Sequence, residues 1–122
     1  MNTFLNNIKQ SLMRILKAFV YSYDGVTAII KSEPAFRQDL CVFAVFTPLS
    51  FILNVSSAER ALMIFALFFI LFAEAVNTAV ETCINRISTD FHPLSKKAKD
   101  IGSFTVLLAF LNAIIIWAVI LL

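Results

Sequence analysis

The sequence predicts an all-α membrane protein, in which an N-terminal amphipathic helix at the membrane interface precedes three transmembrane helices in one domain of residues 1–122. Composition is the first reason: 60% of the residues are hydrophobic and only 15% are charged, whereas soluble domains carry about 25% charged residues. The second reason is that polar residues gather between three apolar stretches, each long enough to cross a bilayer.

Residues 2–31 predict the amphipathic helix, because their apolar side chains recur at helical spacing. One face would carry Phe4, Ile8, Leu12, Ile15 and Phe19, and the other Asn6, Asn7, Gln10, Arg14 and Lys17. A helix with this pattern rests in the membrane interface. We expect Gly25 to interrupt it and a short helical continuation to follow.

The three predicted spans cover residues 35–55, 58–86 and 101–122. Pro34 marks the start of the first span, since proline is favoured in the first turn of a helix. Ser56 or Ser57 is expected to cap the second span. A loop over residues 88–99 would lead to the third span, which contains no charged residue.

Basic residues predict the orientation of these spans. They cluster before residue 38 and again between residues 86 and 99, whereas the connection between the first two spans carries Arg60 alone. The positive-inside rule therefore places the N-terminus and the 86–100 loop in the cytoplasm, and the C-terminus on the other side.

The stretch Glu74-Ala-Val-Asn77-Thr78-Ala-Val-Glu81 is the strongest functional signal. Its polar residues share one face of a helix. Carboxylates inside a membrane span are costly and mark functional sites, and carboxylate and amide oxygens suit Mg²⁺. In the alternative interpretation these side chains only pair with basic residues of neighbouring helices.

Two further segments lie at the same membrane boundary. Residues 33–39 supply Glu33 and Arg37, whose guanidinium can bind phosphate in a bidentate manner, and residues 91–103 supply Lys96, Lys97 and Lys99. Acids for a metal and cations for phosphate indicate phosphoryl transfer from a nucleotide to a lipid, with no nucleic-acid partner. No P-loop or kinase glycine-rich loop is present. The alternative roles of these segments are interfacial anchoring and membrane topology.

Three spaced motifs carry a resemblance to a known family: Glu33-x-Ala-Phe-Arg37-Gln38, Glu74-x-x-Asn77-x-Ala79-x-Glu81, and His92-x-Leu94-Ser95-x-x-Ala98-Lys99-Asp100-x-Gly102-Ser103. The chain resembles the prokaryotic diacylglycerol kinase family. The resemblance implies a homotrimeric helical bundle in the bacterial inner membrane, with a periplasmic C-terminus and active sites shared between protomers. It also implies Mg²⁺-dependent transfer of phosphate from ATP to diacylglycerol, which gives phosphatidic acid.

Residue roles follow from the same resemblance. Glu74 is expected to be the base, with Asn77 and Lys99 as further catalytic residues. Glu33 and Glu81 would hold Mg²⁺. The expected nucleotide contacts are Arg14, Lys17, Tyr21, Glu33, Glu81, His92, Lys99 and Asp100, and the expected lipid contacts are Glu74, Arg37, Gln38 and Ser103. Asn85 departs from the pattern, since many relatives are expected to carry an acid there.

Other functions agree with part of the sequence. An undecaprenol kinase would perform the same chemistry on a polyprenol. A small transporter subunit would use Glu74 for proton coupling, although this leaves the lysine-rich loop without a role. A non-catalytic subunit would use its polar residues only for helix packing.

Overall fold

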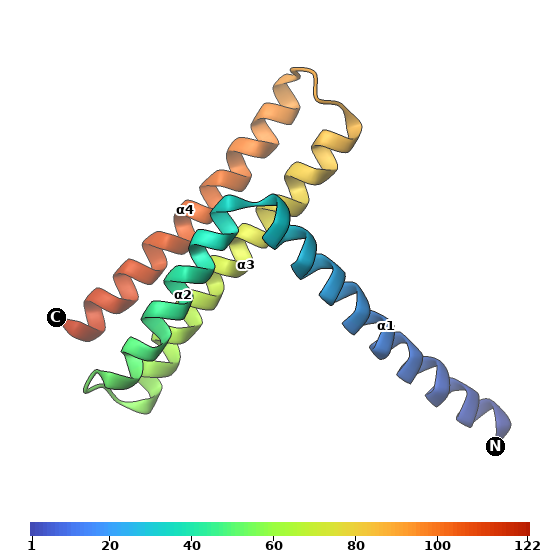
Figure 1. The fold of residues 1–122 in the computed structure, drawn as a ribbon, viewed down its shortest axis with the longest axis horizontal. Helices are drawn as coiled ribbons and strands as arrows, with labels where there is room; N and C mark the ends of the chain where they lie inside the picture. Colours follow the sequence, from blue (N-terminus) through green and yellow to red (C-terminus); the bar gives the residue numbers. More distant parts are fainter. The chain divides into compact units, whose positions relative to one another are not determined.

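The computed structural model describes residues 1–122, which form four helices and no strand (Figure 1). Helix α1 (Asn2–Ser32) makes up one compact unit, and Glu33–Leu122 form a second. The second unit contains α2 (Pro34–Ile52), α3 (Ser57–Ile87) and α4 (Pro93–Leu121), each long and apolar enough to cross a membrane. The predicted fold class, three membrane spans preceded by an N-terminal helix, is confirmed.

Helix α1 is continuous over 31 residues and buries none of them. The prediction that Gly25 interrupts it is therefore wrong. A glycine inside a helix costs only about 1 kcal/mol relative to alanine, which a long helix tolerates. Hydroxyl groups on both sides of Gly25 bond within the helix, since Ser22 Oγ donates to the Ala18 carbonyl and Thr27 Oγ1 to the Tyr23 carbonyl, both at 2.8 Å.

Helix α2 ends at Ile52, before the predicted end of the first span at residue 55, and Arg60 of α3 binds the backbone there. The Arg60 Nε donates to the Ser50 carbonyl at 2.8 Å, and its Nη2 to the carbonyls of Leu53 and Val55 at 3.3 and 3.4 Å. The last carbonyls of a helix lack partners within the helix. The guanidinium supplies a donor for the Ser50 carbonyl of the helix and for two carbonyls of the connection that follows, and it lies 5.3 Å from the centroid of the Phe51 ring.

Helices α3 and α4 each begin at a side-chain cap. Ser56 Oγ accepts a hydrogen bond from the Glu59 amide at 3.2 Å, so Ser56, one of the two predicted residues, caps α3. At α4, His92 Nδ1 accepts from the Leu94 amide at 3.1 Å. The predicted loop over residues 88–99 is thus wrong after residue 92, because this cap, followed by a proline in the first turn, starts the helix at Pro93.

Helix α3 is the central element, since it packs against both α2 and α4. Small residues make up much of the α3–α4 contact, which allows the two backbones to approach closely. The buried cluster in this contact consists of Ala66, Ile70, Ala73, Ala109 and Ala113. A hydrogen bond of 3.2 Å from Trp117 Nε1 to the Met63 carbonyl also joins the two helices.

The α3–α4 hairpin extends beyond the start of α2, as Figure 1 shows. Helix α2 has 19 residues, whereas α3 has 31 and α4 has 29. The first turns of α2 therefore lie beside the middle of α3 rather than beside its end. This arrangement determines which residues of α2 can approach the polar face of α3.

We predict that Arg60→Ala lowers the free energy of unfolding by about 2 kcal/mol, because three carbonyls then lose a charged donor. Helical ellipticity followed through an SDS titration in mixed micelles measures the change. Arg60→Lys is the matched control: it keeps the charge but not the planar fork, and an intermediate loss is expected. Equal stability of Arg60→Ala and the parent protein would contradict this role.

Candidate functional site

The polar face of α3 is buried within the three-helix unit. Glu74 and Asn77 are each 7% exposed, and Thr78 is 9% exposed. Glu81 lies further along the same face and is partly exposed. The Asn77 Nδ2 donates to Glu81 Oε1 at 3.4 Å, so the amide links the buried part of the face to the more open carboxylate.

Carboxylates from α2 join this face. Glu33, at the N-cap of α2, and Asp39, in its second turn, both lie close enough to Glu74 to interact with it electrostatically, as does Glu81. No lysine or arginine pairs with Glu74. Three acids thus surround one buried carboxylate that has no cation paired to it.

Asp39 is the member of this group to which sequence reasoning assigned no role. Its side chain is 7% exposed, and its Oδ2 is buried without a hydrogen-bond partner. The available signal was a carboxylate inside an apolar span, the same signal that identified Glu74. Its position near the start of the span suggested an interfacial residue. Contact with α3 buries it instead.

These acids do not form a complete metal site in the single chain. No group of three or more His, Cys, Asp or Glu side chains lies close enough to hold a metal ion. The donors present near Glu74 are oxygen atoms, which suit Mg²⁺, an ion that usually keeps several waters and takes substrate phosphates as ligands. The type of donor therefore fits Mg²⁺, and the single chain by itself does not complete the ligand set of the ion.

The lysines predicted to bind phosphate lie in the first two turns of α4, next to the end of α3. Lys99 is partly exposed, and its Nζ donates to Asn85 Oδ1 of α3 at 2.8 Å. Lys96 and Asp100 form an exposed ion pair of 2.5 Å along α4. Because Asn85 is neutral, Lys99 is held in place while its charge is not cancelled by its partner.

The remaining predicted residues lie at several places. His92 caps α4 through Nδ1, and Ser103 is exposed on α4. Arg37 and Gln38 are exposed on α2. Arg14, Lys17 and Tyr21 share one exposed face of α1, which forms its own unit. The three-helix unit thus brings Glu33, Glu74, Asn77 and Glu81 together, whereas Lys99 and Asp100 lie further along the hairpin.

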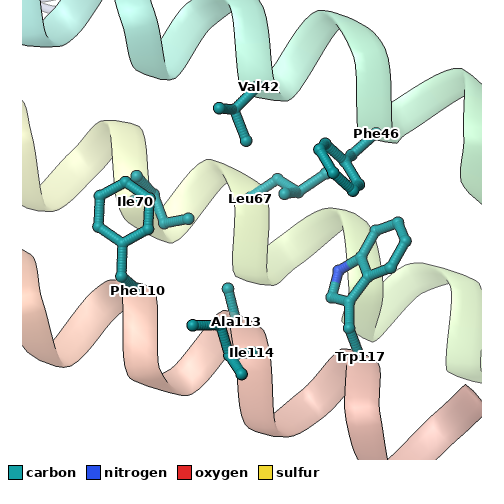
Figure 2. Close-up of a pocket in the computed structure, with 8 residues that line it drawn as sticks. All are labelled: Val42, Phe46, Leu67, Ile70, Phe110, Ala113, Ile114 and Trp117. Carbon is teal, nitrogen blue, oxygen red and sulfur yellow. The ribbon is translucent and has the colours of Figure 1, made fainter.

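An apolar cavity of about 180 Å³ lies between the three helices of the second unit (Figure 2). Every residue that lines it is hydrophobic: Val42, Phe46, Leu67, Ile70, Phe110, Ala113, Ile114 and Trp117. Ile70 precedes Glu74 by one helical turn, about 6 Å along α3. The cavity therefore begins next to the carboxylates and extends along the apolar part of the spans.

Comparison with known proteins identifies one family. A family model described as prokaryotic diacylglycerol kinase matches residues 20–121. A diacylglycerol kinase of Pseudomonas aeruginosa is 44% identical over 111 residues, which cover 91% of this chain and 90% of the relative. The diacylglycerol kinase of Escherichia coli K12 is 36% identical over 88% of both chains. That of Haemophilus influenzae is 36% identical over 87% of this chain and 90% of its own length.

We predict that Asp39→Asn raises the free energy of unfolding by about 1 kcal/mol, because a buried carboxylate without a partner is unfavourable. SDS titration in mixed micelles provides the measurement. Asp90→Asn, which removes an exposed carboxylate in the α3–α4 connection, is the control and should leave stability unchanged. A loss of stability in Asp39→Asn would show that a group outside the single chain holds this carboxylate.

Proposed function

The chain belongs to the prokaryotic diacylglycerol kinase family and is thus an ATP-dependent lipid kinase, and we propose that its buried carboxylates catalyse direct transfer of the γ-phosphoryl group to diacylglycerol. The observation that carries this mechanism is the position of Glu74, a carboxylate 7% exposed in a candidate membrane span, surrounded by acids and paired with no cation. Such a group is available to accept a proton from a lipid alcohol.

Glu74 acts as the general base in this proposal. Its carboxylate accepts the proton of the diacylglycerol hydroxyl, and the oxygen bonds to the γ-phosphorus of ATP. The bond from that phosphorus to the oxygen bridging the β- and γ-phosphates breaks, and ADP leaves. Phosphoryl transfer depends mainly on the alignment of these groups and on stabilisation of phosphate charge.

Glu33 and Glu81 are the proposed ligands of Mg²⁺. Both lie near Glu74, and Asn77 holds Glu81 by a hydrogen bond, as a partner of a metal ligand does. Magnesium, when bound, neutralises charge on the β- and γ-phosphates. Magnesium usually keeps several waters and takes substrate phosphates as its further ligands, so two carboxylates are enough for such an ion.

Cationic groups complete the proposed nucleotide site. Lys99 contacts phosphate in this proposal. Its hydrogen bond to Asn85 fixes the position of the ammonium group, and because Asn85 is neutral the positive charge is not cancelled. The further proposed nucleotide contacts are Arg14, Lys17, Tyr21, His92 and Asp100. Arg37, Gln38 and Ser103 are exposed, and we assign them to the lipid.

The apolar cavity supports a lipid as the acceptor. An acyl chain that enters the space between Phe46, Ile70 and Ile114 would extend from the reaction centre towards the middle of the bilayer. Its hydroxyl group would then stay near Glu74, one turn away. The cavity thus provides a way to hold the apolar part of the substrate while its alcohol reacts.

Assembly and orientation belong to the same proposal. We assign a homotrimer with active sites shared between protomers, as the resemblance to the diacylglycerol kinase family implies. The basic residues favour a cytoplasmic N-terminus and a periplasmic C-terminus in the bacterial inner membrane. ATP then reaches the site from the cytoplasm.

We predict that Glu74→Gln lowers lipid phosphorylation by at least about 100-fold, because the amide cannot accept the proton. The measurement is transfer of radiolabel from γ-labelled ATP to lipid in micelles. Glu59→Gln, on the same helix near its start, is the matched control and should retain activity. Undiminished labelling by Glu74→Gln would remove the base assignment.

The lipid acceptor and the metal are tested in the same assay. Diacylglycerol should be labelled in preference to undecaprenol, and faster labelling of undecaprenol would reassign the acceptor.

Glu81→Gln should raise the Mg²⁺ concentration required for half-maximal activity by at least about tenfold, as expected for loss of a metal ligand. An unchanged requirement would show that Glu81 does not bind the ion.

The acyl-chain cavity gives a further prediction. Ile114→Trp places a larger side chain in the cavity wall and should raise the KM for long-chain diacylglycerol by about tenfold. Short-chain diacylglycerol should be affected less. Ile115→Trp is the matched control, because Ile115 is similarly exposed, 60% against 62%, and does not line the cavity. Equal effects of the two variants would contradict an acyl chain in this cavity.

A further inference from the structure

The side chain of Asn77 lies against Gly102, where α3 and α4 approach each other. Both residues are buried. A Cβ atom at Gly102 would overlap the Asn77 Oδ1 and lie 3.2 Å from its Cγ. The amide of Asn77 therefore occupies the space that any side chain at position 102 would require.

The backbone of α4 does not require a glycine at this position. Gly102 has helical conformation, and no glycine in the chain has a positive φ. Alanine is favoured over glycine inside a helix, so conformation alone would favour a side chain here. Gly25 provides the contrast within the same chain, since a Cβ there would meet nothing within 4 Å. The reason for a glycine at position 102 is the space that it leaves for Asn77.

Hydrogen bonds hold the Asn77 amide at only one of its two ends. Its Nδ2 donates to Glu81 Oε1 at 3.4 Å, whereas Oδ1 is buried and has no hydrogen-bond partner. The orientation of the amide therefore depends on the packing of Oδ1 against Gly102. If that packing changes, the Nδ2 group turns away from the Glu81 carboxylate.

We propose that Gly102 is a positioning residue for phosphoryl transfer. Because Gly102 has no side chain, the Asn77 amide packs against it in the orientation in which the amide donates to Glu81. The inference rests on the proposed function, in which Glu81 binds Mg²⁺. Gly102 touches neither substrate nor metal and acts through Asn77. The α3–α4 packing is thereby coupled to the geometry of the acidic group.

The first test compares Gly102→Ala with Gly25→Ala in the full-length protein in micelles. Gly102→Ala should lower kcat by about 10- to 100-fold, the effect of a displacement of about 1 Å near the reaction. It should also raise the Mg²⁺ concentration for half-maximal activity by about tenfold, as loss of a metal ligand's partner does. The same substitution at Gly25 should change neither value. Equal effects of the two substitutions would overturn the proposal.

The second test asks whether Gly102 acts through Asn77. In an Asn77→Ala background, Gly102→Ala should cause no further loss of activity, because the group that it displaces is absent. Equal losses in both backgrounds would overturn the inference while leaving the proposed function intact. Full activity of Asn77→Ala by itself would instead contradict the role of Asn77 in the proposed function.

A third readout needs neither activity nor metal. The side-chain amide resonance of Asn77 in a ¹⁵N-labelled protein should shift in Gly102→Ala and stay unchanged in Gly25→Ala. If Gly102→Ala does not assemble, assembly should return when Asn77→Ala is added, which relieves the overlap. Failure of that double variant to assemble would show that Gly102 serves helix packing alone and would overturn the proposal.

Discussion

Close packing of α3 against α4 is the constraint on which the arrangement of the three-helix unit depends. Alanines on both helices allow the approach, and at Gly102 the backbone of α4 meets the side chain of Asn77 directly. The same packing brings Lys99 to Asn85 and Trp117 to the Met63 carbonyl. Larger side chains along this contact would separate the polar groups that depend on it, because protein interiors tolerate little added volume.

The difference in length between α2 and the α3–α4 hairpin determines which charged groups lie near Glu74. Glu33 and Asp39 lie in or just before the first turns of α2, so their carboxylates approach Glu74 in the middle of α3. Lys96 and Lys99 instead lie in the first two turns of α4, where Lys99 bonds to Asn85 near the end of α3.

The presence of the helices and the polar face of α3 could be predicted from the sequence, because both follow from the local spacing of apolar and polar residues. The spans are apolar over lengths that match a bilayer, and Glu74, Asn77 and Glu81 recur at helical spacing. The errors concern helix ends and interruptions, such as Gly25 and the start of α4 at Pro93. These depend on small energies, such as the cost of one glycine or the cap at His92, which composition does not reveal.

The sequence by itself determined the fold class, the family and the polar face of α3, because these depend on which side chains follow one another along a helix. Only the tertiary structure decided that Asp39 is buried beside Glu74, that Asn85 holds Lys99 and that Gly102 makes room for Asn77. Each of these contacts joins two helices, and their register and separation result from the packing of whole helix faces. No spacing within one segment specifies that register.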